Sequence, residues 1–253
     1  MTQITILNVF PAQLNVNGDS GNVLTLRRRL DWAGVPAHVV DADLGTHWWN
    51  QRPDIVHLGG GTIAAQRAVL SDLRSGRDQL LDWAADGVSI LGVAGGFHLL
   101  LDHIQFPGDD APQAGLGLLR GRSSAADTRV SEYTVVEADG ELVHGYQNSG
   151  QLVDLDPDAT PWGLVIAGVG NRTAPGTEGA VNGGVLGSNL NGPLLPRNPL
   201  VADAILARSA ARRGLDYITT DHHAHVDALA AQASTIIRDR LGAGARVAPP
   251  VRK

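Results

Sequence analysis

Residues 87–101 read Gly-Val-Ser-Ile-Leu-Gly-Val-Ala-Gly-Gly-Phe-His-Leu-Leu-Leu, and this stretch decides the fold. The apolar run over 87–93 predicts a buried strand, Ala94-Gly95-Gly96 predicts a sharp turn, and a helix begins at Phe97. A strand, a tight turn and a helix in this order lift one side chain out at the carboxyl edge of a parallel sheet. The sequence therefore predicts an α/β fold with an exposed position at Ala94.

The segments before this unit repeat the alternation of strand and helix. Strands are expected at 4–10, 39–40 and 54–58, and helices at 23–33, 62–73 and around 80–83. Three consecutive arginines, Arg27, Arg28 and Arg29, are predicted to form a solvated helix face.

The second half has a different pattern. Short strands bounded by glycine at 133–137, 142–146, 164–166 and 184–187 favour the antiparallel part of a mixed sheet, and helices return at 199–213 and 222–241. We predict an α/β domain over residues 1–213, a C-terminal helical extension over 214–241 and a flexible tail over 242–253.

Composition excludes several classes of function. The 20 basic and 26 acidic side chains give a net charge of −6, which argues against binding nucleic acid by bulk electrostatics. The chain has no cysteine, so it has no thiolate metal site and no cysteine nucleophile. The N-terminus lacks the pattern of a secretory signal, and no run reaches the roughly 18 apolar residues of a membrane span, so we expect a cytoplasmic protein without membrane contact.

Several motifs occur in the order of a known family. They are Gly18–Leu30, Leu58–Gly61, Gly92–Leu100, Gly115–Leu119, Gly170-Asn171, Gly176–Ala180 and Asn191–Pro199. Together they resemble the cobyric-acid-synthase-type (CobB/CobQ-like) class I glutamine amidotransferases, and among them the GatD-type glutaminase subunits of lipid II isoglutaminyl synthase. The resemblance covers roughly residues 4–210 and implies a flavodoxin-like fold, with a mixed, mostly parallel sheet flanked by helices.

The family's chemistry is implied by this resemblance. A cysteine thiolate at the turn attacks the glutamine carboxamide, a histidine on a later loop activates it, and backbone N–H groups stabilise the oxyanion. Ammonia then passes to a partner, which in the GatD-type proteins is an ATP-dependent, Mur-ligase-like subunit that activates the D-glutamate carboxylate of the peptidoglycan stem.

This chain departs from the family at each catalytic position. Ala94 replaces the cysteine, and Asn191 stands where the family has histidine before Gly-Pro-Leu-Leu-Pro. The family's Glu-Asn-His-Gly segment reads Gln147-Asn148-Ser149-Gly150. We therefore predict that no catalytic residue is intact, with Ala94, Asn191 and Ser149 as degenerate positions.

The scaffold around the turn remains. Gly60, Gly61 and Gly95, beside Gly59, are predicted to offer backbone donors at an oxyanion-like site, or else to serve only as tight turns. Arg129 aligns loosely with an arginine that the resemblance associates with the substrate carboxylate, and a surface role is the equal alternative.

A replacement nucleophile is the first open alternative. Candidates by residue type are Thr62, Ser123, Ser149 and Ser188, but no motif ties His98 or His144 to any of them. His98 itself is predicted to be an ordinary helix residue.

Two further features are singled out. His222, His223 and His225 beside Asp221 and Asp227 have metal-like spacing, although an exposed helix start capped by aspartate is the preferred interpretation and no metal site is predicted. The adjacent Trp48 and Trp49 indicate either a partner contact or a lid over a small core.

The leading hypothesis is a catalytically degenerate amidotransferase-like subunit, without cofactor, that binds and supports a Mur-ligase-like, ATP-dependent partner in a heteromer. The first alternative is a glutaminase subunit that supplies ammonia to a carboxylate such as lipid II D-glutamate, with Ala94 an inactivating, engineered change. The second is a sensor that binds glutamine or another small amide without hydrolysis.

Overall fold

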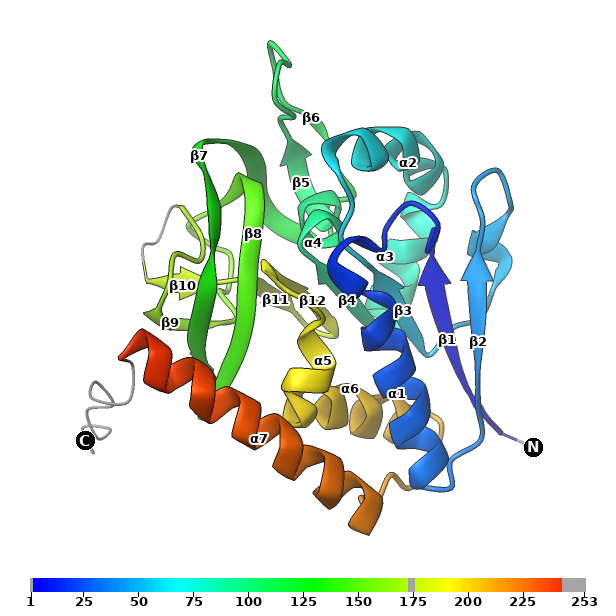
Figure 1. Cartoon of the computed structure of the whole chain (residues 1–253). Coiled ribbons are helices and arrows are strands. Elements are labelled where there is room, and N and C mark those ends of the chain that lie inside the picture. Colours follow the sequence, from blue (N-terminus) through cyan, green and yellow to red (C-terminus); the bar gives the residue numbers. More distant parts are fainter. Residues whose placement is uncertain (1, 173–175, 243–253) are drawn as a thin grey trace.

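The computed structural model describes residues 2–172 and 176–242 (Figure 1). The predicted flexible tail lies outside these residues, except for Gly242. Within the described helices, none is both long and apolar enough to cross a bilayer.

The first sheet carries the predicted strand-turn-helix unit. Its order is β11-β12-β4-β3-β1-β2, in which β11 is antiparallel to β12 and the other neighbours are parallel. Its strands are β1 (Ile4–Val9), β2 (Ala37–Ala42), β3 (Ile55–Leu58), β4 (Ser89–Val93), β11 (Ala180–Asn182) and β12 (Val185–Ser188). The predicted α/β class, with a mixed, mostly parallel sheet, is confirmed.

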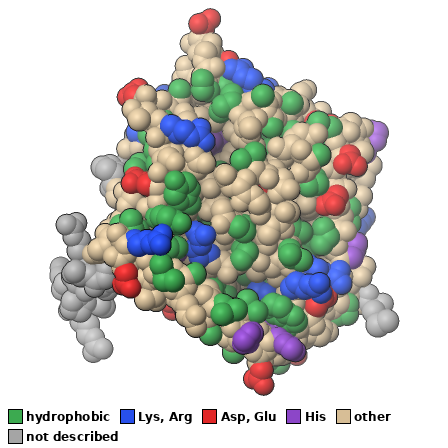
Figure 2. Space-filling view, viewed as in Figure 1, with side chains coloured by type: hydrophobic (Ala, Val, Ile, Leu, Met, Phe, Trp, Pro, Cys, Tyr) green, Lys and Arg blue, Asp and Glu red, His purple; other side chains and the backbone are tan. Residues whose placement is uncertain are grey.

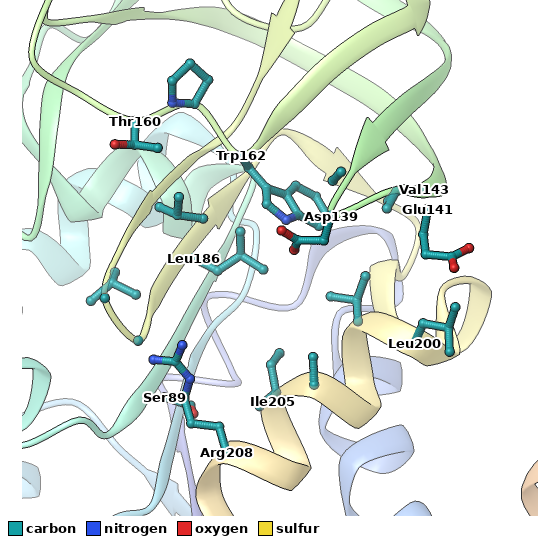
Figure 3. Close-up of a pocket in the computed structure, with 18 residues that line it drawn as sticks. Ser89, Asp139, Glu141, Val143, Thr160, Trp162, Leu186, Leu200, Ile205 and Arg208 are labelled. Carbon is teal, nitrogen blue, oxygen red and sulfur yellow. The ribbon is translucent and has the colours of Figure 1, made fainter. Parts of the chain in front are cut away.

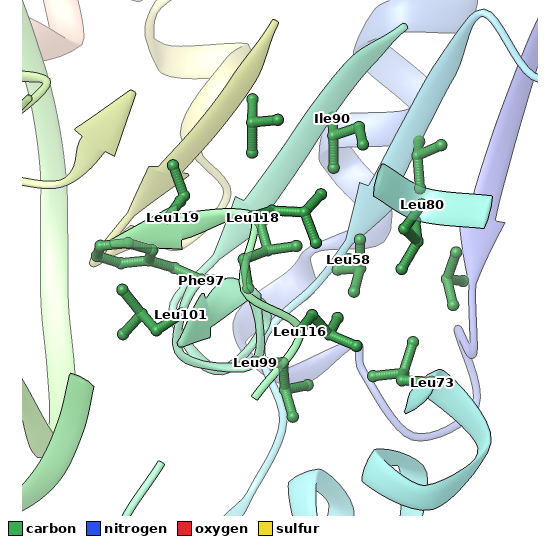
Figure 4. Packing of buried hydrophobic residues seen from close by; sticks show 14 of the residues in the cluster. Leu58, Leu73, Leu80, Ile90, Phe97, Leu99, Leu101, Leu116, Leu118 and Leu119 are labelled. Atoms are coloured by element: carbon green, nitrogen blue, oxygen red, sulfur yellow. The ribbon is translucent and has the colours of Figure 1, made fainter. Parts of the chain in front are cut away.

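Helices cover both faces of this sheet because successive strand residues point to opposite sides and both sets are apolar. In β1, Leu7 and Val9 belong to a core shared with α2 (Ile63–Ser75), α3 (Arg77–Ala85) and α4 (Gly95–Leu100). Figure 4 shows leucines from these elements packed around Phe97 and Ile90. On the other face, Ile4 and Ile6 pack with α1 (Ser20–Trp32), α5 (Leu194–Arg197) and α6 (Pro199–Arg212).

A second, mostly antiparallel sheet of seven strands stands beside the first (Figure 1). Its members are β5 (Leu101–Ile104), β6 (Gln113–Ala114), β7 (Leu119–Ala138), β8 (Glu141–Leu155), β9 (Gly163–Ala167), β10 (Thr177–Glu178) and β13 (Leu190–Asn191). The strands predicted at 133–137, 142–146 and 164–166 lie in this separate sheet, within β7, β8 and β9. The prediction that 184–187 is antiparallel to its neighbours is wrong in part, because this segment is β12, which pairs parallel with β4 in the first sheet and antiparallel only with β11.

The β7–β8 hairpin is much longer than the two short strands expected from the sequence. β7 has 20 residues and β8 has 15, and they turn at Asp139 and Gly140, both with positive φ. Residues 123–132 have too few apolar side chains to show a strand period, and the register shifts between Ala125 and Val130. Side-chain periodicity therefore underestimates the length of a hairpin that is held by backbone hydrogen bonds.

Helix α7 (Asp221–Leu241) packs on its own chain. It contacts α1, α5 and β7, and in Figure 1 it lies across the lower ends of β7 and β8. Its anchor is Arg29, which is 1% exposed and bonds Asp203 of α6 at 2.6 Å and Asp227 of α7 at 2.7 Å. The prediction that all three arginines are solvated is wrong for Arg29, because a helix wheel of α1 alone does not include α6 and α7.

Arg29→Met keeps the length of this side chain but leaves Asp203 and Asp227 without their shared cation. We expect the free energy of unfolding to fall by about 3 kcal/mol, because carboxylates of low exposure lose their partner. Urea denaturation measures this change. The matched variant is Arg28→Met, whose side chain is 62% exposed and which should change stability by less than about 0.5 kcal/mol. Equal effects in the two variants would contradict the anchoring role of Arg29.

Candidate functional site

Ala94 occupies the sharp turn between β4 and α4, where the sequence predicts it. Its backbone has φ 48° and ψ −110°, a strained conformation for a residue with a Cβ. Its N–H donates to the Ser188 carbonyl at 2.7 Å, and its carbonyl accepts the His98 N–H at 3.0 Å. The side chain is a methyl group that is only 7% exposed. The turn thus has the geometry that presents a side chain, but it presents no reactive group.

The glycines that follow Ala94 are required by close backbone packing. A Cβ on Gly96 would lie 2.0 Å from the Leu58 carbonyl oxygen, and a Cβ on Gly95 would lie 2.8 Å from the Gly61 nitrogen. The N-terminus of α4 therefore lies directly against the loop at 59–61. Gly61 and Gly95 lie close together, and their role as donors to a ligand stays a prediction.

The N–H of Gly60 is already engaged within the protein. It donates to Oδ2 of Asp19, a side chain that is 0% exposed and also accepts from Asn22 Nδ2 at 3.1 Å. Burial raises the pKa of Asp19 to about 7. A ligand oxygen at the predicted oxyanion position of Gly60 would therefore have to displace the Asp19 carboxyl group.

Asn191 lies in β13, which pairs with β8 opposite Tyr146. It is 1% exposed, and its Nδ2 has no hydrogen-bond partner among the described residues. Ser188, whose carbonyl bonds the Ala94 N–H, precedes it by three residues. Asn191 therefore follows closely in the chain on a residue that bonds the turn, but an amide cannot act as the base that an imidazole provides.

The other degenerate positions have structural roles. Gln147 bonds the backbone of Gly170 through both amide atoms, at 2.9 and 3.1 Å. The Ser149 hydroxyl accepts the Gln151 N–H at 3.0 Å. These side chains fix the β8 strand and its neighbouring loop.

Among the described residues, none of the four candidate nucleophiles bonds a histidine. Thr62 caps α2 by accepting the Ala65 N–H, Ser188 donates to Glu178 at 3.3 Å, and the buried Ser123 Oγ has no partner in the described structure. His98 is 1% exposed and lies 3.4 Å from Asn189 Oδ1, and burial lowers its pKa to about 4. Within the described ranges, neither His98 nor His144 bonds a serine or threonine hydroxyl.

Glu178 is an organising residue that the sequence reasoning missed. It is 0% exposed, its Oε1 accepts the Asn189 N–H at 2.6 Å, and Asn189 Nδ2 donates to Asn171 at 3.2 Å. Burial raises the pKa of Glu178 to about 7. This network holds the segment between β12 and Asn191. The sequence signal for Glu178 is an acidic side chain within the motif Gly176-Thr-Glu-Gly179. The motif alone does not show which groups this side chain bonds.

Arg129 is exposed on β7, beside the register shift of the hairpin. Its Nε donates to Asn148 Oδ1 on β8 at 3.0 Å. The structure shows this cross-strand contact, and a role of Arg129 towards a ligand stays a prediction.

The histidine cluster is organised around helix capping. Thr220, not Asp221, is the N-cap of α7, and it forms a reciprocal capping box with His223. His223 is 0% exposed, and its Nε2 lies 3.0 Å from the Arg29 carbonyl oxygen. The predicted aspartate cap is therefore wrong. The predicted exposure holds for Asp221, His222 and His225 but not for His223, which α7 buries against α1.

Trp48 belongs to the core. It is 2% exposed, its indole N–H donates to Asp72 at 2.9 Å, and its ring packs against Phe10 and Trp83. The burial of Trp48 supports the interpretation of the tryptophan pair as a lid over a small core.

Four cavities have volumes of about 580, 520, 510 and 290 Å³, and none of these four includes Ala94, Asn191 or Ser149. The largest lies between α6 and the β11–β12 hairpin, where Trp162, Leu186 and Ile205 line it (Figure 3). These volumes therefore lie away from the turn that positions a nucleophile in the family.

Comparison with known families decides the classification. The CobB/CobQ-like glutamine amidotransferase domain matches residues 5–199. The chain belongs to this family. The amidotransferase-type turn at Ala94 and the Gly-rich loop at 59–61 both lie within the matched range.

Two relatives are subunit GatD of lipid II isoglutaminyl synthase (glutamine-hydrolyzing). The Staphylococcus aureus protein is 28% identical over 219 residues, covering 86% of this chain and 88% of the relative. The Streptococcus pneumoniae protein is 26% identical over 216 residues, covering 83% and 82%. Both matches extend over most of each protein.

Solved structures show the same fold. The PurLQS structure from Thermotoga maritima matches with a TM-score of 0.55 and 16% identity, covering 84% of this chain and 98% of that chain. A glutamine amidotransferase from the same organism matches with a TM-score of 0.52 and 12% identity, covering 96% of each chain. At such identities the likeness concerns the fold.

Ala94→Gly should stabilise the protein by about 1 kcal/mol, because glycine adopts a positive φ without the cost that a Cβ brings. Urea denaturation measures the change. The matched control is Ala202→Gly in α6, a buried alanine in a helix, which should destabilise by about 1 kcal/mol. A loss of stability in both variants would show that the turn at Ala94 is not strained.

Glu178→Gln tests the buried carboxyl group through the pH dependence of stability. Its pKa is raised from 4.5 to about 7 in the folded state, so the folded state holds a proton that the unfolded state loses between these values. The stability from Glu178 is present below the lower value and is lost as pH rises through about 7. Relative to the wild type, the variant should therefore gain about 2–3 kcal/mol between pH 4.5 and pH 8. Chemical denaturation across this range measures the gain, with the exposed Glu137→Gln as the control. A difference between Glu178→Gln and the wild type that does not change with pH would contradict the assignment.

Proposed function

We propose that this chain is a catalytically inactive amidotransferase-like subunit that binds and supports an ATP-dependent, Mur-ligase-like partner. The observation that carries the proposal is Ala94, a methyl group on a strained turn whose family counterpart carries the thiolate. Thiol-based hydrolysis requires a nucleophile and a base that raises its thiolate fraction. Ala94 and Asn191 supply neither.

The surroundings of the turn support the same conclusion. The Gly60 N–H bonds the buried Asp19, Ser149 accepts a backbone N–H, and His98 is kept neutral by burial. Each of these groups is used within the fold. Glutamine hydrolysis through the family mechanism would need several of them to change together with Ala94.

The partner role is supported by the relatives. Both GatD proteins are named as subunits of a glutamine-hydrolyzing lipid II isoglutaminyl synthase, so a chain of this type functions within a complex. Loss of catalytic groups does not require loss of the core or of an interface. We infer that the partner amidates a peptidoglycan carboxylate with free ammonia, or uses another amine, while this chain stabilises it in the cytoplasm.

The glutaminase alternative requires that Ala94 be an isolated, inactivating change in an otherwise working site. Asn191 and Ser149 argue against it, because disabling a thiol does not require replacing an imidazole. The sensor alternative requires a pocket at the turn that takes glutamine. Calorimetry with glutamine distinguishes it from the scaffold role, since a scaffold gives no heat of binding.

The native chain should co-purify with a Mur-ligase-like protein, and the complex should release no ammonia from glutamine above background. Mass spectrometry identifies the partner, and a coupled ammonia assay measures hydrolysis. The Staphylococcus aureus GatD complex serves as the positive control. Ala94→Cys alone should also stay at background, because no imidazole is present to activate the new thiol.

Glutamine hydrolysis in proportion to the amount of wild-type chain would overturn the inactive assignment. Its loss in Ser149→Ala or His98→Ala would then locate a new nucleophile or base. Purification without any ligase-like protein would remove the partner role and leave the sensor alternative for the calorimetric test.

A further inference from the structure

A second candidate site lies far from Ala94 in the sequence, under helix α7. A cavity of about 510 Å³ opens between the turn end of the β7–β8 hairpin, the junction of α5 and α6, and the C-terminal half of α7. Val143, Leu200, Val201 and Ala231 give it apolar walls, and His144, Arg197 and Arg238 give it polar ones. Figure 2 shows basic side chains among apolar ones on the left of this face, near α7.

His144 is the buried polar group of this cavity. It is 2% exposed, and its backbone N–H and carbonyl both bond the Asn198 side chain at 2.8 Å, which fixes the residue in place. Its Nε2 is buried without a hydrogen-bond partner in the described structure. An imidazole nitrogen in this state is costly unless a ligand bonds it.

Two arginines approach the same cavity with unused hydrogen-bonding capacity. Arg197 donates to the Gly192 carbonyl at 3.3 Å, but its Nη1 is buried without a partner. Arg238 donates to the Thr235 hydroxyl at 3.2 Å. Among the described ion pairs, neither arginine has a carboxylate partner.

The charges around His144 show that these groups act on one another. Burial, followed by the positive charges of Arg238 and Arg197, lowers the pKa of His144 to about 4. Of the acids that line the cavity, Asp227 is already paired with Arg29, and Glu141 is exposed on β8. The cavity therefore has two cations and a neutral imidazole, and its two acids form no described ion pair with either arginine.

We propose that this cavity binds a small phosphate monoester, with Arg197 and Arg238 donating to the phosphate oxygens and His144 Nε2 bonding a further oxygen. Guanidinium groups match the geometry of phosphate oxygens, and a tetrahedral phosphate offers enough oxygens for three separate partners. A neutral imidazole nitrogen accepts the hydrogen of a protonated phosphate oxygen. The apolar walls take the organic group of the ester.

The experiment titrates the full-length protein with butyl phosphate, inorganic phosphate, sulfate and butanol by calorimetry at constant ionic strength. Butyl phosphate should bind more tightly than inorganic phosphate because its chain covers the apolar walls. Sulfate should bind more weakly than phosphate because it has no hydrogen to offer His144 Nε2 near pH 7. Butanol should give no measurable binding.

Arg238→Gln should weaken butyl phosphate binding at least about tenfold, since it removes a charge-assisted contact. The matched control is Arg240→Gln on the same helix, which is exposed and does not line the cavity; it should leave binding unchanged. Circular dichroism checks that both variants keep the fold. The ring ¹⁵N signals of His144 in the wild-type protein should shift on titration, which reports contact at the site without any substitution.

Several results would overturn the proposal. Absence of butyl phosphate binding at millimolar concentration would do so, as would equal weakening by Arg238→Gln and Arg240→Gln, which would indicate non-specific attraction. Binding only to vesicles that contain phosphatidic acid, without binding of the soluble ester, would assign the arginines to a surface that meets lipid headgroups instead of to this cavity. None of these measurements depends on a ligase partner or on glutamine, so they test the cavity independently of the proposed function.

Discussion

The architecture depends on one close approach of backbone to backbone, where the start of α4 lies on the ends of β3 and β4. Gly96 faces the Leu58 carbonyl and Gly95 faces the Gly61 nitrogen at distances that leave no room for a Cβ. This contact forces Ala94 into its positive φ and sets the path from the parallel sheet into β5. The turn geometry of the amidotransferase family therefore persists for a packing reason, whether or not it carries a nucleophile.

Polar groups around this turn are bonded to one another instead of facing an open cavity. Asp19 joins the start of α1 to Gly60, Asn22 reaches the Leu195 N–H at 2.8 Å, and Glu178 holds the segment before Asn191. These bonds stabilise the network, because the buried carboxyl groups of Asp19 and Glu178 each accept backbone N–H groups. It also explains how a chain can lack a catalytic thiol and imidazole and still keep the surrounding fold.

The sequence predicted most of the parallel half and little of the antiparallel half. The mainly apolar strands β1, β3 and β4 are short and are followed by Phe10-Pro11, Gly59 and Ala94-Gly95, so the sequence shows where each strand ends. The extra length of the β7–β8 hairpin and the Glu178 network were missed, because the pairing partners carry no local signature. Arg29 was misassigned for the same reason, since the two carboxylates that bury it come from α6 and α7.

The sequence by itself determined the α/β class, the family and the absence of cysteine, because these follow from local patterns and residue identity. Only the tertiary structure decided that Asp19 engages Gly60, that His223 caps a helix, and that His144 meets two arginines in one cavity. The residue type determines which bonds a side chain can make. Its partners depend on long-range packing, which places groups more than a hundred positions apart within bonding distance.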